Sequence, residues 1–192
     1  MAKKHDERCK ACKKMVEQLL SVLYGEVKTN YNLDLPSNID GYSGSVFETE
    51  LETIYTTLQK YRGHDSFVKA KKLPNVDYFV PSPGFIVEFD ESQHFSKPRE
   101  IVLSKYPDSL NLGFNKRKWR NLCVSLNRKD NDPVYRDEQR AWYDTLRDFA
   151  PTILKLKPTI RIFASDTVWC SLNPNVKSDH NIFKKTIKVI DK

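Results

Sequence analysis

Alternation of apolar and polar positions predicts a β-hairpin between residues 73 and 95. The runs VDYFV (76–80) and GFIVEF (84–89) flank a Pro-Ser-Pro-Gly turn. With the turn centred between Ser82 and Pro83, Asp77 lies opposite Glu88. Because side chains two apart in a strand share a face, Asp77, Glu88 and Asp90 are expected on one face. The other face is predicted to pack on a core and carries Tyr78, Val80, Phe85, Val87 and Phe89.

Helical periodicity predicts four helices around this hairpin. They span residues 6–24, 47–61, 98–106 and 134–149, and Pro151 is expected to end the last one. Further strands are predicted at 122–126, 159–164 and 167–172, with a last short element at 183–190. Residues 27–44 are expected to form a loop. A helix joined to the next strand by a short connection fits a crossover onto the hairpin sheet.

Composition narrows the class of protein. The chain has 192 residues, of which 39% are hydrophobic, and this suits one globular domain. The formal net charge of +7 favours an acidic partner, of which nucleic acid is the commonest. No apolar run approaches the roughly 20 residues of a membrane span, and the basic N-terminus lacks the apolar stretch of a signal peptide. A soluble, cytoplasmic protein is therefore expected.

The four cysteines fit an intracellular protein. Cys9 and Cys12 have the spacing of half a zinc site, but no second close Cys/His pair follows, and Cys123 and Cys170 are isolated in the sequence. Zinc is therefore not expected, and Cys9 and Cys12 are interpreted as ordinary helix residues. The alternative is a zinc knuckle that distant residues or a second chain complete.

The acidic face of the hairpin suggests chemistry. Directly opposed carboxylates, with Cβ atoms roughly 4.5–5.5 Å apart, repel each other and weaken a hairpin. A hard cation such as Mg²⁺ would relieve this repulsion and can activate water beside a phosphodiester. Gln93 and His94 follow the second strand and could reach phosphate or water in the same place. The alternative is a solvent-facing strand whose acids only keep an edge soluble.

These residues carry a family resemblance. The pattern Pro-Asn-Val-Asp at 74–77, Ile-Val-Glu-Phe-Asp at 86–90 and Gln-His at 93–94 resembles the active-site core of the PD-(D/E)XK nuclease superfamily. It is most similar to the very-short-patch-repair-like and restriction-endonuclease-like branch. The resemblance implies an α/β fold with a restriction-endonuclease-like core, in which helices flank a mixed central sheet. It also implies DNA hydrolysis that depends on Mg²⁺, with Mn²⁺ as the alternative ion.

Residue by residue, Asp77 and Glu88 match the metal-binding acids of the family, and His94 matches its histidine. Asp90 occupies the position of the superfamily's lysine. This departure leaves two questions open, whether another residue supplies the cation and whether hydrolysis has been lost. Lys129 and Arg136 are the candidate replacements, and the sequence does not choose between them.

The family also places a glutamate near the metal from a helix ahead of the hairpin, and Glu48 matches that pattern. The alternative is that Glu48 only caps its own helix, with Ser45 as the N-cap residue. The predicted organisation is one domain over residues 1–192. Its nuclease-like core covers about 45–95 and 120–165, with an N-terminal helix at 6–24 and a basic insertion at 96–120.

Basic residues mark candidate contacts to nucleic acid. Four cations surround Trp119 at positions 116–120, a combination suited to phosphate contact and base stacking. The alternative is that Trp119 anchors the core and that the other cations form a solvated surface. The candidate nucleic-acid-binding residues are Lys71, Lys72, Lys116, Arg117, Lys118, Arg120, Lys129, Arg136 and Arg140.

Two functions follow from these residues. The first is a Mg²⁺-dependent endonuclease acting on DNA. Its catalytic residues are Asp77, Glu88, Asp90, Gln93 and His94, and its metal ligands are Asp77, Glu88 and Glu48. The second is an inactive nuclease-fold protein that binds DNA or RNA. A homodimer is compatible with either function.

Overall fold

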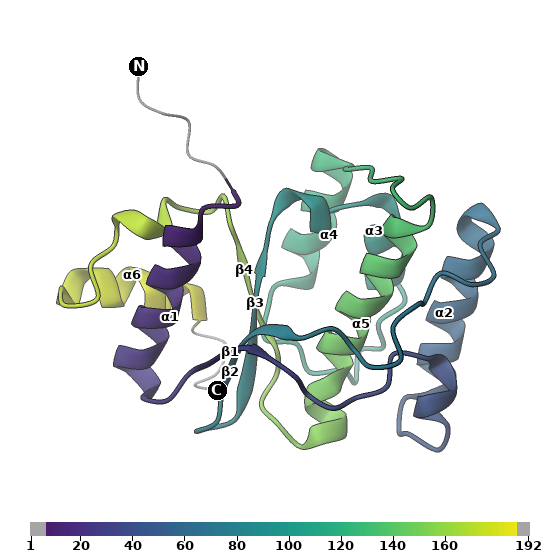
Figure 1. Ribbon diagram of the computed structural model, residues 1–192, viewed down its shortest axis with the longest axis horizontal. Helices are drawn as coiled ribbons and strands as arrows, with labels where there is room; N and C mark the ends of the chain where they lie inside the picture. Colours follow the sequence, from purple (N-terminus) through teal and green to yellow (C-terminus); the bar gives the residue numbers. More distant parts are fainter. Residues whose placement is uncertain (1–6, 188–192) are drawn as a thin grey trace.

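A four-stranded mixed sheet forms the centre of the computed structural model, which describes residues 7–187 (Figure 1). Its strands are β1 (Lys28–Tyr31), β2 (Val76–Val80), β3 (Phe85–Asp90) and β4 (Ile160–Phe163), in the order β1-β2-β3-β4. The pairs β1–β2 and β2–β3 are antiparallel, whereas β3 and β4 are parallel. The chain therefore has an α/β fold with an open sheet, and helices flank this sheet on both sides.

The helices divide between the two faces of the sheet (Figure 1). On one face lie α1 (Lys10–Tyr24) and α6 (Lys177–Ile187), together with the short helix η3 (Trp169–Ser171). On the other face lie α2 (Glu48–Arg62), α3 (Lys97–Leu103), α4 (Lys116–Leu126) and α5 (Arg136–Leu154). Two further short helices, η1 (Ile39–Tyr42) and η2 (Ser92–His94), precede α2 and follow β3.

The predicted hairpin is confirmed in its register. Tyr78 pairs with Val87, and Phe79 pairs with Ile86. Gly84 closes the turn with φ +91°, a backbone conformation that favours glycine. The predicted apolar face is buried against α1, η3 and α6, as expected from the two-residue period.

Three predicted elements differ from the structure. Residues 122–126 are not a strand, because they form the last turns of α4, in which Trp119 and Cys123 are buried one turn apart. Residues 167–172 contain the short helix η3 instead of an edge strand. The segment 27–44, predicted as a loop, contains β1 and η1. β1 is too exposed for its sequence to show an apolar period.

Several helix boundaries also differ from the prediction. The first helix begins at Lys10 and not near residue 6. Pro151 does not end α5, which continues to Leu154. Proline leaves the carbonyl of Arg147 without its usual backbone donor, and the hydroxyl of Thr159 donates to that carbonyl at 2.7 Å. The last helix covers Lys177–Ile187, and positions 188–190 of the predicted last element lie outside the described residues.

The start of α2 corrects the predicted capping box. The N-cap residue is Phe47, not Ser45, and the hydroxyl of Ser45 is buried without a partner within residues 7–187. Glu48 accepts hydrogen bonds from the Gly44 N–H at 2.8 Å and the Ser43 hydroxyl at 3.1 Å. Among the described helices, none is long and apolar enough to cross a membrane.

Candidate acid–base site and nucleic-acid interface

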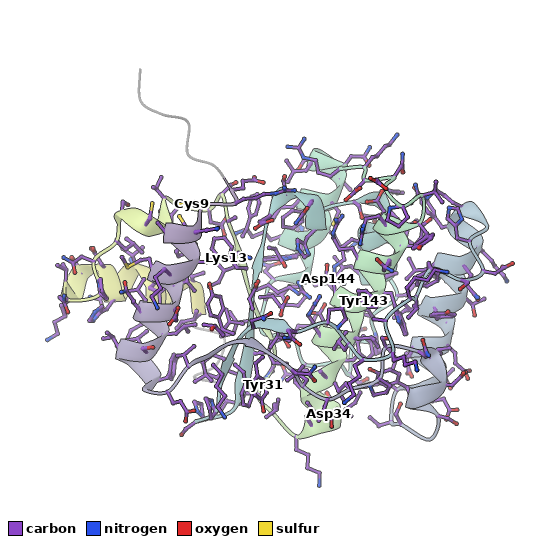
Figure 2. The ribbon with its side chains drawn as sticks, in the orientation of Figure 1. Cys9, Lys13, Tyr31, Asp34, Tyr143 and Asp144 are labelled. Carbon is purple, nitrogen blue, oxygen red and sulfur yellow. The ribbon has the colours of Figure 1, made fainter. Side chains whose placement is uncertain are left out.

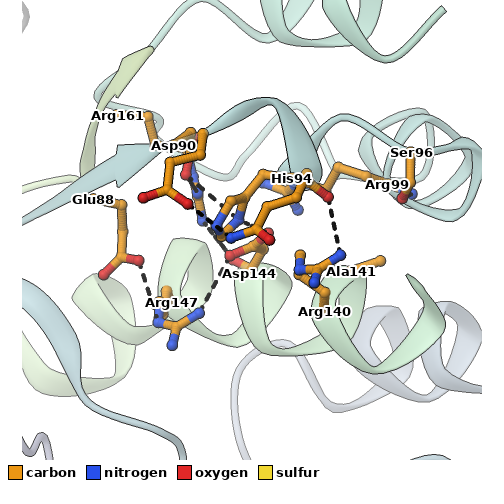
Figure 3. Close-up of polar contacts among 12 residues, drawn as sticks. Glu88, Asp90, His94, Ser96, Arg99, Arg140, Ala141, Asp144, Arg147 and Arg161 are labelled. Carbon is orange, nitrogen blue, oxygen red and sulfur yellow. Dashed lines mark hydrogen bonds and ion pairs between the residues drawn. The ribbon is translucent and has the colours of Figure 1, made fainter. Parts of the chain in front are cut away.

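The crossover helix α5 brings charged side chains against the acidic face of the sheet. Asp144, Arg147 and Asp148 lie one turn apart on α5, and each side chain is at least nine-tenths buried. Figure 3 shows Asp144 and Arg147 facing Glu88 and Asp90 of β3. Charged groups therefore occupy part of this face of the sheet, beside apolar core residues such as Ile86 and Phe163.

Arg161 of β4 lies at the centre of this buried cluster and is 2% exposed. Its guanidinium donates to Asp90 Oδ1 at 2.7 Å, to Asp148 Oδ1 at 2.7 Å and to the carbonyl of Asp144 at 3.0 Å. The parallel pairing of β3 and β4 places Arg161 beside Glu88. One strand residue thus joins β3 to the crossover helix.

The deep end of the cluster is closed by Arg99 of α3. Its guanidinium donates to Asp148 Oδ2 at 2.6 Å and to the Tyr106 hydroxyl at 2.7 Å. The Tyr106 hydroxyl also lies 2.8 Å from the same carboxylate oxygen. Asp148 is therefore held by two arginines and a tyrosine and has no exposed atom for a ligand.

The opposite end holds Glu88 and Arg147. Arg147 Nε lies 3.4 Å from Glu88 Oε2, and Arg147 Nη1 donates to Asp144 Oδ1 at 3.2 Å. Burial raises the pKa of Glu88 to about 8, although Arg147 opposes this shift. Glu88 is 4% exposed, so water cannot screen its charge.

His94 lies where the cluster reaches the surface. Its Nδ1 is 2.9 Å from Asp144 Oδ2 and 3.7 Å from Asp90 Oδ1. The side chain is 19% exposed, and Nε2 has no hydrogen-bond partner within residues 7–187. Burial alone would lower the pKa of His94, but Asp144 and Asp90 raise it above its ordinary value. Asp144 thus orients the ring and favours its protonated form.

The net charge of the buried cluster indicates that it binds one proton. Its four carboxylates face three guanidiniums, so one negative charge remains. A single proton on either Glu88 or His94 neutralises that charge. Both groups have raised pKa values, as this balance requires. The carboxylates belong to Glu88, Asp90, Asp144 and Asp148, and the guanidiniums to Arg99, Arg147 and Arg161.

Asp77 and Glu88 satisfy backbone groups at the point where the hairpin pairing ends. Asp77 Oδ2 accepts from the N–H of Phe89 at 2.9 Å, and Glu88 Oε1 accepts from the N–H of Asp77 at 3.3 Å. The second oxygen of Asp77 lies 3.2 Å from Lys13 Nζ, and Figure 2 shows Lys13 between α1 and the sheet. These two acids therefore use their oxygens on protein donors.

Gln93 lies outside the buried cluster. Its side chain donates to Glu91 Oε2 at 2.8 Å, and its carbonyl accepts from Arg140 Nη1 at 3.0 Å. Neither contact involves His94. The proposed replacements for the family lysine are also elsewhere, since Lys129 is exposed and Arg136 bonds to the carbonyl of Asp132.

The structure brings Asp77 and Glu88 into contact but places Glu48, the third predicted metal ligand, elsewhere. Glu48 accepts from Ser43 and Gly44 in the loop before α2 and lines a separate groove beside η1 and α2. A different group, Asp90, His94 and Asp144, has ligand atoms within 4.8 Å of one another.

This second group does not fit a divalent cation as it is paired here. Asp90 accepts from both Arg161 and the indole N–H of Trp119, each at 2.7 Å. Asp144 is bonded to His94 and Arg147. The cluster lacks one positive charge, and a dication would overcompensate it. Asp90, His94 and Asp144 are therefore interpreted as an acid–base group and not as a metal site.

Helix α4 presents a basic surface on the outside and reaches the cluster on the inside. Lys116, Arg117 and Arg120 line a groove along it. A second groove of about 550 Å³, on the other side of Val124, is lined by Lys97, Arg128, Lys129 and Arg62 among others. On the inner side, Trp119 donates to Asp90. We call the cations that line the two outer grooves the α4 basic surface; they are Arg62, Lys97, Lys116, Arg117, Arg120, Arg128 and Lys129.

One residue of the α4 basic surface bonds to the backbone next to His94. The N–H of Arg128 donates to the carbonyl of Phe95, the next residue along, at 2.9 Å. Lys118 of the predicted nucleic-acid set is instead paired with Asp166. The exposed Lys71 and Lys72 line none of these grooves, and Lys72 pairs with Asp34. The structure thus groups some of the predicted cations and separates others.

Sequence reasoning missed Asp144, Arg147, Asp148 and Arg161 as members of the site. A signal existed in the first three, whose 3- and 4-residue spacings place them on one side of a helix. Arg161 stands between two isoleucines in a short strand, which is unusual for a charged residue in a sheet core. Comparison of the chain with family models, curated proteins and solved structures found no match.

Proposed function

We propose that this chain hydrolyses phosphodiester bonds in nucleic acid, with DNA as the substrate and His94 as the group that exchanges a proton. The observation that carries the proposal is the buried cluster that lacks one positive charge and ends at the exposed edge of His94. Buried charges of this kind are costly, and pKa values shifted toward neutrality concentrate at catalytic sites.

The geometry supports specific roles. Asp144 holds Nδ1 of His94, so Nε2 is the nitrogen that can accept or donate a proton at the surface. Asp144 is a positioning residue in this scheme, because it acts through His94. Arg128, whose backbone N–H donates to the carbonyl of Phe95, and Lys129 line a groove of the α4 basic surface and would bind the phosphate backbone. The fold we propose for this activity is the restriction-endonuclease-like core.

The test is cleavage of plasmid, single-stranded and duplex DNA, and RNA, in the presence of Mg²⁺, Mn²⁺ or EDTA. His94→Gln should lower the rate by about 10²–10⁴-fold, the usual contribution of general acid–base catalysis. His64→Gln is the matched control, because this half-buried histidine lies in the loop after α2. Asp144→Asn should lower the rate less than His94→Gln does, since the imidazole itself remains. Folding of every variant is checked by circular dichroism.

Full activity in folded His94→Gln protein would remove His94 from the mechanism. The metal arms have separate outcomes. Cleavage that survives EDTA supports the site as paired here. Cleavage that requires Mg²⁺ or Mn²⁺ would show that an ion takes part in the reaction and that the pairing described here is not the active form.

One observation favours a second function, nucleic-acid binding without hydrolysis. Asp77 and Glu88 accept from backbone amides, Asp77 also accepts from Lys13, and Glu88 forms an ion pair with Arg147. These are structural roles. A binding protein would bind DNA equally in Mg²⁺ and EDTA, and His94→Gln would leave the affinity unchanged.

Both functions use the α4 basic surface, so binding is measured on the same protein. Arg117→Gln combined with Lys129→Gln should weaken DNA binding. It should also reduce the slope of log affinity against log salt by about 0.9 for each phosphate that the variant no longer neutralises. Lys184→Gln with Lys185→Gln is the matched control, because these exposed lysines lie on α6, across the sheet. Equal losses of affinity in both double variants would place the DNA elsewhere.

A further inference from the structure

Three cysteines from opposite ends of the chain meet at the start of α1. Cys9 is the N-cap residue of this helix, Cys12 lies one turn further on, and Cys170 belongs to η3. Their sulfur atoms all lie within 4.8 Å of one another. The sequence alone does not reveal this arrangement, because 158 positions separate Cys12 from Cys170. Figure 2 shows Cys9 at the end of α1 that faces the C-terminal segment.

The packing of α1 on η3 holds the three thiols together. Cys12 is 1% exposed, and the N–H of Cys170 donates to its sulfur at 3.3 Å. Trp169, the neighbour of Cys170, is buried between Phe89 and Phe183, which fixes η3 against the sheet. The sulfur positions are therefore set by the core on this side of the sheet and not by a flexible loop.

The number of converging sulfur atoms distinguishes a metal site from a redox pair. A thiolate is the form that binds soft and borderline metals. A redox pair would need only Cys9 and Cys12. The third sulfur, converging from another segment, is the feature that a metal site requires.

We propose that Cys9, Cys12 and Cys170 bind one zinc ion. Three thiolates supply three corners of the tetrahedron that zinc adopts in structural sites. Water or one further residue takes the fourth corner.

A zinc ion here would tie the first helix to the C-terminal segment. It would also fix Lys13, the residue after Cys12, which lies 3.2 Å from Asp77 and 3.6 Å from Glu91. The zinc ion would not take part in hydrolysis, because none of its ligands belongs to the buried charged cluster. The proposal therefore stands or falls independently of the nuclease function.

The test measures metal content and metal spectra on the full chain. Protein purified under reducing conditions should contain one zinc per chain. Replacement of zinc by cobalt should give the thiolate-to-cobalt charge-transfer band of a tetrahedral site. Cys9→Ser and Cys170→Ser should each lose the zinc and the cobalt band. Cys123→Ala is the matched control, since Cys123 is buried in α4 across the sheet, and it should retain both.

A second measurement guards against variants that do not fold. Removing zinc from the wild type with a chelator should lower its melting temperature, and adding zinc back should restore it. The proposal is overturned if folded, reduced wild type binds neither zinc nor cobalt, or if Cys170→Ser keeps its zinc. A disulfide between Cys9 and Cys12 that persists in reducing buffer would also overturn it.

Discussion

Both faces of the central sheet carry an apolar core, but within residues 7–187 only one of them also buries a cluster of charged side chains. Toward α1 and α6, the strands bury Val80, Val87 and Phe89 in an apolar core. Toward α5, the same strands bury Glu88, Asp90 and Arg161. β3 supplies both sides and is fully buried along its whole length. One strand thus stabilises the fold through one face and holds charged groups through the other.

This difference between the two faces indicates which one carries the functional residues. An apolar core gains free energy from each buried side chain, whereas burying ion pairs is often no better than burying hydrophobic groups of similar size. Burying four carboxylates and three arginines together is therefore not explained by a gain in folding free energy. The face toward α5 is the one from which His94 reaches the surface.

The largest expected effect comes from removing the central cation. Arg161→Met should destabilise the protein by about 3–5 kcal/mol, because Asp90 and Asp148 would each lose a buried arginine partner. Arg117→Met, on the exposed side of α4, should cost about 0.5 kcal/mol or less. Urea unfolding at neutral pH measures both values. Equal stability in the two variants would mean that the buried charges are not coupled as described.

A smaller effect concerns how stability depends on pH. Burial raises the pKa of Glu88 from 4.5 to about 8. Arg147 opposes this shift, and the negative charges of Asp77 and Asp144 add to it. Between these values the folded protein holds a proton that the unfolded chain has lost. The contribution of this proton to the free energy of unfolding is fully present below pH 4.5 and is lost as the pH rises through about 8.

Glu88→Gln should therefore flatten the decline of unfolding free energy between pH 4.5 and about 8. Leu19→Ala, on the apolar face, provides the comparison. It should lower stability by about 2–5 kcal/mol at every pH, because no titrating group is involved. A wild-type decline that Glu88→Gln leaves unchanged would assign the proton to another residue.

The sequence predicted the hairpin well because local signals determine it. The period of two and the turn residues placed Phe79 opposite Ile86, and the structure has that pair. It predicted the strand at 122–126 wrongly because a short apolar run fits either a strand or one side of a helix. Burial of Trp119 and Cys123 one turn apart, together with the Asp90 contact, is a tertiary effect that selects the helix.

The candidate site was only partly predictable for the same reason. Asp77, Glu88, Asp90 and His94 are close in sequence, so their grouping could be inferred from one motif. Their partners come from β4 and α5, and only the folded chain shows that those elements carry matching cations. Cys170 is a second example, because nothing near it in sequence points to Cys9 and Cys12.

Titration of the His94 ring by NMR tests most directly whether Glu88 and His94 share one proton. In the wild type, the His94 pKa should lie above the ordinary value of 6.5. Glu88→Gln removes the excess negative charge, so the His94 pKa should be lower in that variant. If His94 instead titrates at the same pH in both proteins, or below 6.5 in the wild type, the two groups do not share a proton and the acid–base role of the cluster is contradicted.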